Sequence, residues 1–143
     1  MSRSILAAVD VSDTENDAKV LREAWKLAQL DGAQLDVVTV VPDFGMSVVG
    51  GFFSPDFHEK AVAKAREALD RFVAETLGPE ANRKIRHVVA TGKVYEEILH
   101  AARVAGSDLI VVGAHKPELA DYLLGPNAAR VVRHADCSVY VVR

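Results

Sequence analysis

The sequence predicts an α/β protein whose single domain is a doubly wound, five-stranded parallel sheet. Short apolar runs of strand length alternate along the chain with longer segments that have helical periodicity. Most of these runs are apolar at consecutive positions, which is typical of parallel strands covered by helices on both faces. Strands joined in this way by right-handed helical crossovers favour the strand order 3-2-1-4-5, with helices on both faces of the sheet.

The candidate strands are the five apolar runs. They span residues 5–9, 35–41, 85–90, 109–112 and 139–142. The third run contains Arg86 and His87, so it is less apolar than the others and is predicted to lie at an edge of the sheet. The last run is the other edge in the predicted order, and an apolar edge is a liability unless another strand pairs with it.

The segments between these runs carry signals for the start and the end of helices. Ser12-Asp13-Thr14-Glu15 fits a capping box, which predicts that Ser12 caps the first helix. Ser54-Pro55 predicts the start of the second helix, because proline is favoured at the first helical position. The third and fourth helices are predicted over residues 93–105 and 128–135. Three glycines predict helix ends: Gly32, Gly78 and Gly106.

Composition and charge argue against several classes of function. The formal net charge of −3 and the lack of a basic run argue against a nucleic-acid or anionic-membrane partner. The single cysteine, Cys137, excludes an intrachain disulfide and is expected to be a small buried residue rather than a redox sensor. The histidines form no metal-binding pattern, so no metal site is predicted. No apolar stretch has the length of a membrane span and no signal peptide is evident, so a cytoplasmic location is expected.

A candidate binding site lies where the first and fourth strands end. In the predicted order the connections from these two neighbouring strands lead to opposite sides of the sheet, and ligands bind at such a switch point, beside the carboxyl ends of the strands. Asp10 ends the first strand, Gly113 ends the fourth, and Gly125-Pro126-Asn127 opens the last helix. Glycines and a helix N-terminus at one point aim backbone N–H groups at an anion, often a phosphate. The alternative is that both glycines only terminate elements and that Asp10 only fixes the turn.

The connection after the second strand is long, apolar and rich in glycine. It covers residues 42–53 and leaves the second strand at the same edge as the crevice. A loop of this composition is expected to cover something. We interpret it as a lid or a dimer contact, and packing on the surface of its own domain is an equally good interpretation.

The order of elements and several local motifs together resemble the universal stress protein family over nearly the whole chain. The motifs are ILAAVDVS at 5–12, GAHKP at 113–117, LLGPNAA at 123–129 and VVRHA at 131–135, and the last three are most similar to the short F-type and G-type members. The resemblance implies one universal stress protein domain over residues 1–143 with a Rossmann-like fold. It also implies a homodimer in which the C-terminal strand Val139–Val142 pairs antiparallel with its mate. Many members of the family bind ATP and act in stress survival without a defined catalytic turnover.

The family's ATP-binding pattern is only partly present. It consists of Gly, two residues, Gly, nine residues, Gly, and then Ser or Thr. Gly113 matches the first glycine and Gly125 the last, but Lys116 stands at the middle glycine, the spacer is one residue short, and Pro126 occupies the Ser/Thr position. A Cβ at position 116 obstructs close approach of a phosphate, although the lysine charge compensates. His115 and Lys116 are therefore candidate nucleotide contacts.

The resemblance also assigns the nucleoside end of the site. Asp10 matches the aspartate that family members direct toward the nucleoside, and Val40 or Val41 lies where a backbone group of the second strand meets adenine. The backbone N–H groups of Asn127 and Ala128 remain available for a phosphate at the start of the last helix.

Three functions follow from these observations. The first is a homodimeric adenine-nucleotide-binding protein, with ATP or a related nucleotide as ligand, that has a regulatory role in the stress response. The second is a dimeric interaction module of the same family that needs no nucleotide, which the departures at Lys116 and Pro126 favour. The third, an enzyme, is not expected beyond slow ATP hydrolysis, because the chain has no Walker lysine motif and no paired carboxylates placed for acid–base work. The sequence leaves the need for Mg²⁺ open, because no ligand set is visible.

Overall fold

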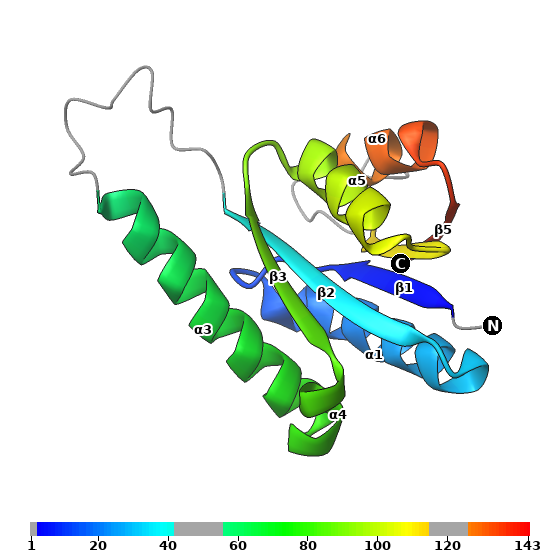
Figure 1. Ribbon diagram of the computed structural model, residues 1–143, viewed down its shortest axis with the longest axis horizontal. Helices are drawn as coiled ribbons and strands as arrows, with labels where there is room; N and C mark the ends of the chain where they lie inside the picture. The colour runs from blue at the N-terminus through cyan, green and yellow to red at the C-terminus, as the bar shows by residue number, and fades with distance from the viewer. Residues whose placement is uncertain (1–2, 42–55, 115–125) are drawn as a thin grey trace.

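The described part of the chain, residues 3–41, 56–114 and 126–143 of a computed structural model, forms one parallel sheet flanked by helices. The strands are β1 (Ser4–Ala8), β2 (Gln34–Val41), β3 (Arg86–Thr91), β4 (Leu109–Gly113) and β5 (Ser138–Val142). The helices are α1 (Thr14–Asp31), α3 (Phe57–Leu77), α4 (Pro79–Lys84), α5 (Val94–Ala105) and α6 (Pro126–His134). The strand order is β3-β2-β1-β4-β5 with every pairing parallel, which confirms the predicted topology (Figure 1).

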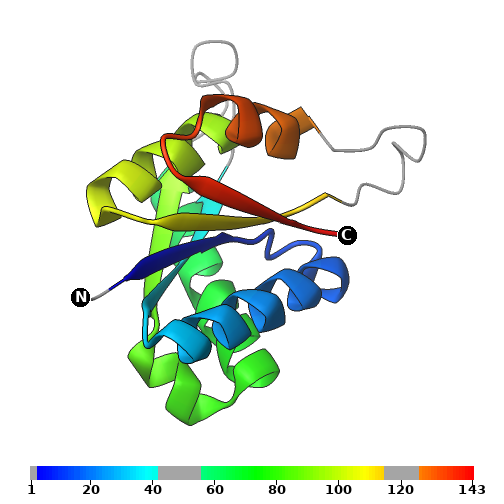
Figure 2. The same cartoon turned by 90° about the vertical axis from the view of Figure 1, so that its right-hand side faces the viewer.

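Helices cover both faces of the sheet (Figure 2). α1 and α3 pack on one face and α5 and α6 on the other. Consecutive residues of β1 point to opposite faces, so Ile5 and Ala7 join the core under α1 and α3, whereas Leu6 joins the core under α5 and α6. Both faces of the central strands are therefore buried, which explains why the strands are apolar at consecutive positions.

The two edges of the sheet are β3 and β5, as the sequence predicts. Most side chains of β3 are half-buried, whereas residues 5–7 of the central strand β1 are fully buried. In β5, Tyr140 is exposed and Val139, Val141 and Val142 are half-buried.

The predicted capping box is wrong. α1 begins at Thr14 with Asp13 at the N-cap position, and no side chain caps the helix. Ser12 turns back instead: its backbone N–H and its hydroxyl both donate to Oδ1 of Asp10, at 2.9 and 2.6 Å. An aspartate two residues earlier offers Ser12 a charged acceptor, and this local turn displaces the cap.

The helix boundaries differ from the sequence prediction at two further places. α3 begins at Phe57, after Asp56, and the predicted start Ser54-Pro55 lies outside the described residues, as does the connection 42–53. Gly78 does end α3, but Pro79 then starts the short helix α4, which the sequence analysis missed. Gly32 and Gly106 end α1 and α5 in the left-handed conformation, with φ of 64° and 65°, as predicted.

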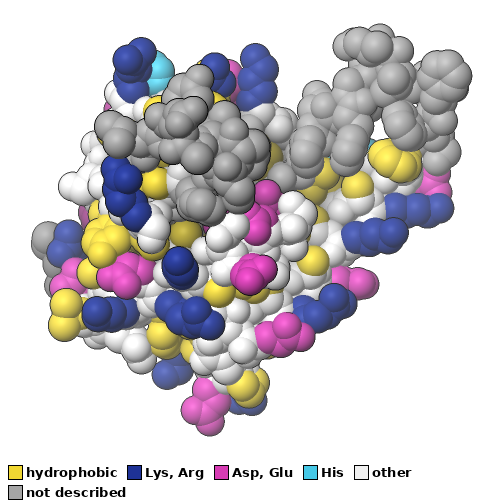
Figure 3. All heavy atoms as spheres, turned by 180° about the vertical axis from the view of Figure 1, so that it is seen from behind, with side chains coloured by type: hydrophobic (Ala, Val, Ile, Leu, Met, Phe, Trp, Pro, Cys, Tyr) yellow, Lys and Arg dark blue, Asp and Glu magenta, His cyan; other side chains and the backbone are white. Residues whose placement is uncertain are grey.

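Basic and acidic side chains alternate over the surface seen in Figure 3, without an extended patch of one sign. Among the described residues, no helix has the length and hydropathy that a membrane crossing requires.

Candidate functional site

The crevice predicted at the carboxyl ends of the strands is present. It has a volume of about 470 Å³ and lies between the ends of β1, β2 and β4, the first turn of α1, one face of α3 and the start of α6. Six of the predicted site residues line it: Asp10, Val40, Val41, Gly113, Asn127 and Ala128. Pro126 begins α6 and does not line the crevice. His115, Lys116 and Gly125 lie outside the described residues.

Asp10 is held in one orientation at the mouth of the crevice. It follows β1 and is exposed. Its Oδ1 accepts both bonds from Ser12, and its backbone N–H donates to a carboxylate oxygen of Asp17. Among the described residues, no donor reaches the second carboxylate oxygen, Oδ2. One oxygen therefore fixes the turn, and the other is available to a hydroxyl or amino group of a ligand.

The backbone of β2 distinguishes Val40 from Val41. Along a parallel strand, the N–H and C=O groups of alternate residues face alternate neighbours. The Val38 carbonyl accepts from Val9 on the β1 side, at 2.9 Å, and the Val41 carbonyl accepts from Gly92 on the β3 side, at 3.1 Å. Val40 therefore faces the β1 side.

β1 ends at Ala8, which is paired with Val38, before it reaches the level of Val40. The backbone N–H and C=O groups of Val40 consequently have no strand opposite them and open toward the crevice. One donor and one acceptor that lie side by side match the edge of a planar nitrogen heterocycle.

Gly113 lies in close contact with α1. A Cβ atom at this position would lie 3.0 Å from Cγ2 of Val20 and 3.4 Å from Oδ1 of Asp17. Val20 is 1 % exposed, so it has little room to move. Packing between β4 and α1 is therefore sufficient to explain a glycine here, whether or not a phosphate binds beside it.

Several lining residues were missed by the sequence analysis. Ala61, Lys64 and Ala65 come from one face of α3, and Asp13 and Asp17 lie one turn apart at the start of α1. Their spacings of three and four residues mark one face of a helix and are visible in the sequence. What the sequence does not show is that both faces point at the same crevice, because this depends on how α1 and α3 pack on the sheet. Thr39, which is 3 % exposed, also lines the crevice.

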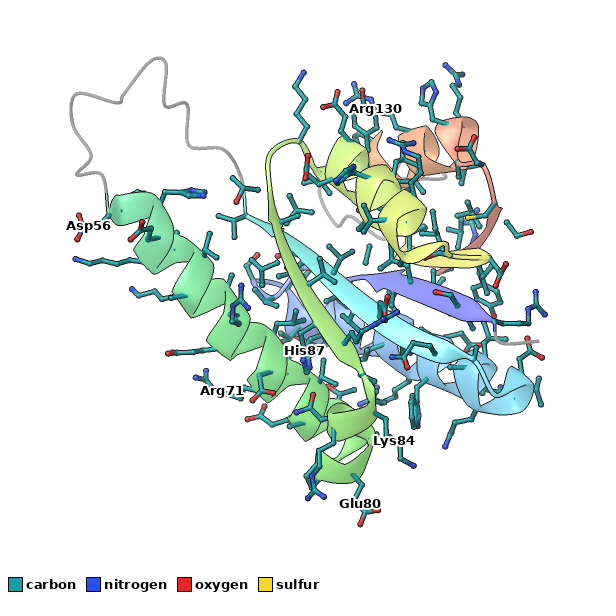
Figure 4. All side chains as sticks on the ribbon, viewed as in Figure 1. Asp56, Arg71, Glu80, Lys84, His87 and Arg130 are labelled. Atoms are coloured by element: carbon teal, nitrogen blue, oxygen red, sulfur yellow. The ribbon has the colours of Figure 1, made fainter. Side chains whose placement is uncertain are left out.

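A second cavity, of about 880 Å³, lies along β3 and the second half of α5. The sequence did not predict it. Its polar centre is a two-point ion pair in which Arg86 Nε and Nη2 lie 2.7 and 3.1 Å from Oδ1 and Oδ2 of Asp36. The hydrogen bonds to Asp36 raise the pKa of Arg86 above its ordinary value. His87, at the opposite face of β3 beside α3 (Figure 4), bonds to Asn82 at 2.7 Å.

No group of three or more histidine, cysteine, aspartate or glutamate side chains in the described part of the chain is arranged to hold a metal ion.

Comparisons with known proteins place the whole chain in one family. The Universal stress protein family matches residues 1–143. The chain is 35 % identical over 147 residues to universal stress protein G of Escherichia coli O157:H7, with 100 % of both chains covered.

Solved structures share the fold. A universal stress protein UspA from Lactobacillus plantarum matches with a TM-score of 0.70 and 28 % identity, over 99 % of this chain and 97 % of that one. A universal stress protein in complex with cAMP matches with a TM-score of 0.68 and 18 % identity, over 99 % and 97 %. One from Archaeoglobus fulgidus in complex with dAMP matches with a TM-score of 0.63 and 18 % identity, over 99 % and 98 %. With the family match over its full length, this chain belongs to the universal stress protein family.

Proposed function

We propose that the protein acts in the cytoplasm as a homodimer that binds an adenine nucleotide, ATP or a related one, in the crevice and so regulates a stress response. The observation that carries the proposal is that one crevice holds three complementary groups: the open backbone of Val40, the Asp10 carboxylate and the N-terminus of α6. Two of the solved structures that share the fold are complexes with the adenine nucleotides cAMP and dAMP.

The base end of the proposed site is β2. Adenine presents an acceptor and an amino donor side by side, and the Val40 N–H and C=O groups match them. Val38 and Ile98 are buried and line the same cavity, so they provide apolar surface for the faces of the ring. Of the two valines that the sequence left open, the pairing pattern of β2 therefore favours Val40.

The sugar and phosphate end lies toward β1 and α6. Asp10 Oδ2 is placed to accept a bond from a ribose hydroxyl. Pro126 has no N–H, so the first donors of α6 are the backbone N–H groups of Asn127 and Ala128, and these favour an anion at the positive end of the helix dipole. His115, Lys116 and Gly125 remain candidate contacts on the sequence pattern alone.

The proposed dimer contact is the free edge of β5. The Val142 carbonyl accepts from Ala114 on the β4 side, at 2.9 Å, so the backbone groups of Val139 and Val141 face away from β4. A second copy related by a two-fold axis can pair antiparallel with this edge. Val141→Pro removes one N–H group that faces away from β4 and none that faces β4. Analytical ultracentrifugation should therefore show a dimer for the wild type and weaker dimerisation for this variant. A wild-type monomer at all concentrations would contradict the contact.

The experiment that tests the proposed ligand begins with protein purified without added nucleotide. The protein is denatured and the released molecules are analysed by chromatography and mass spectrometry, and emptied protein is then titrated calorimetrically with adenosine, AMP and ATP. Asp10→Asn keeps an acceptor for Ser12 but loses the charged oxygen, and it should weaken binding about tenfold to a hundredfold.

The matched control is Asp31→Asn, which makes the same change at the far end of α1. If the purified protein carries no nucleotide and shows no calorimetric response at millimolar ligand, the proposal is refuted. The interaction module that needs no nucleotide is then the remaining function.

A further inference from the structure

We propose that Tyr95 is a positioning residue of the crevice: its ring, in contact with Arg130, keeps the start of α6 in place for the phosphate of a bound nucleotide. This inference rests on the proposed nucleotide site. The observation behind it is that α5 and α6 both line the crevice, and that an aromatic ring of α5 lies against two side chains of α6.

The two helices contribute to different ends of the proposed site. The first half of α5 provides Val94 and Ile98, which line the crevice at the base end. The first turn of α6 provides Asn127 and Ala128, whose backbone N–H groups are the proposed donors to the phosphate. A nucleotide can therefore use both ends at once only if α6 keeps its position relative to α5.

Packing alone fixes α6 weakly. The helix has nine residues, Pro126–His134, and a helix of this length is not stable in water by itself. Its buried side chains are those of Ala128 and Val131, which bury little apolar area. Among the described residues, no hydrogen bond or ion pair joins a side chain of α5 to a side chain of α6. A specific contact between the two helices therefore has to come from the Tyr95 ring.

The Tyr95 ring lies along one side of α6, where α5 and α6 run next to each other (Figure 4). Cζ of Arg130 lies 5.1 Å from the ring centroid, within the range of a cation–π attraction. The ring of His134 lies 6.3 Å from the Tyr95 ring, with an interplanar angle of 32°. Residues four apart share one face of a helix, so the Tyr95 ring spans a full turn of α6 and opposes its rotation and sliding.

Tyr95 is itself held in place. It is half-buried and packs against the apolar core beneath α5 and α6, whereas Arg130 is exposed. A cation–π contact at an exposed site changes an equilibrium about twofold to fivefold. Because this contact fixes α6 and not the base end of the crevice, its loss should weaken binding of the phosphate and not of the nucleoside. The ratio of the affinity for AMP to that for adenosine measures this difference.

The first test is calorimetric titration of the full-length protein with adenosine and with AMP. Tyr95→Leu keeps apolar bulk and loses the ring, so it should lower the affinity for AMP about twofold to fivefold and change that for adenosine little. Tyr95→Phe keeps the ring and should keep the wild-type ratio. This second variant also removes the 3.3 Å bond from the phenol to Glu96, so it tests whether that bond matters.

The second test changes the cation. Arg130→Ala should lower the ratio as Tyr95→Leu does. The matched control is Arg133→Ala, which removes the same charge from the same helix three residues further along and should leave the ratio unchanged. Tyr95→Leu combined with Arg130→Ala should lose no more than either change alone, because both remove one contact. Both arginines are exposed, so these variants carry the test even if circular dichroism shows that Tyr95→Leu does not fold.

An independent measurement needs no ligand. Amide hydrogen exchange followed by nuclear magnetic resonance reports local opening of each element. Tyr95→Leu should speed exchange of the backbone N–H groups of residues 130–134 about twofold to fivefold and leave exchange in β1 unchanged. A residue that only stabilises the whole fold would speed exchange in β1 as well.

Four results would overturn the inference while the nucleotide site stands. They are an unchanged ratio in Tyr95→Leu and Arg130→Ala, equal losses in Arg130→Ala and Arg133→Ala, additive losses in the double variant, and exchange that rises equally in β1 and α6. If the wild type binds neither adenosine nor AMP, the proposed function itself fails and the inference fails with it.

Discussion

Arg86 on β3 holds the carboxylate of Asp36 on β2 by two parallel hydrogen bonds, of 2.7 and 3.1 Å, between directly paired residues of neighbouring strands. The partners differ sharply in exposure: the Asp36 side chain is 3 % exposed and that of Arg86 is 63 % exposed. The pair therefore neutralises a buried anion from the edge of the sheet. Gln34 provides only a long third contact, at 3.5 Å.

Arg86→Ala should destabilise the fold by about 1–3 kcal/mol, because it leaves the Asp36 carboxylate buried without its principal donor. Arg86→Lys should recover part of this loss, since it restores the charge but not the two-point geometry. Urea denaturation monitored by circular dichroism measures both. Arg83→Ala, an exposed arginine in α4, is the control for loss of a positive charge. Equal unfolding free energies for the variants at 83 and 86 would show that the pair does not stabilise the fold.

Gly113→Ala should destabilise the protein by about 1–3 kcal/mol through overpacking against Val20. A double-mutant cycle tests this mechanism. Val20→Ala removes the methyl group that a new Cβ would meet, so the alanine at 113 should cost less in the Val20→Ala background than in the wild type. If the two costs simply add, the contact with Val20 is not the reason for the glycine.

The fold was predictable because it depends on local patterns combined with general rules of chain topology. Each predicted strand lies within one residue of the observed one, since most strands are apolar runs that polar residues, glycine or proline delimit. The parallel order then followed from alternation and handedness alone. α4 was missed because Pro79 serves two roles: a proline that cannot continue α3 is also well placed to begin another helix.

The site was predictable only where strand ends determine it. Asp10 and Gly113 end neighbouring strands, so topology alone places them together. Asp17 and Lys64 belong to helices on either side of the crevice, and their approach depends on side-chain packing that no local pattern encodes. The choice of Val40 over Val41 likewise needed the register of β1 against β2, which a shift of one residue would reverse.

Tyr140 should ionise at higher pH than an ordinary tyrosine. Its hydroxyl donates a 2.8 Å bond to Oε1 of Glu23, which raises the pKa of the phenol, because the tyrosinate could not donate and would face the glutamate charge. The contact between β5 and α1 is therefore present below the ordinary tyrosine pKa and is lost as the pH rises through the raised one. Ultraviolet difference titration against Tyr140→Phe isolates this residue. Glu23→Gln should lower its pKa, and an unchanged titration in that variant would contradict the assignment.

The Cys137 thiol should react slowly with disulfide reagents at neutral pH. Burial raises its pKa, and the negative charges of Asp136 and Asp108 add to the effect, so less thiolate is present than in a free cysteine. As the only cysteine, it can be followed in the unmodified protein by the absorbance of released thionitrobenzoate. The rate should increase with pH, and the midpoint of this increase should lie above that of free cysteine. Asp136→Asn should lower the midpoint, and unfolding of the protein should lower it more. A neutral-pH rate equal to that of free cysteine would instead support a reactive, redox-sensing thiol, the role that the sequence argues against.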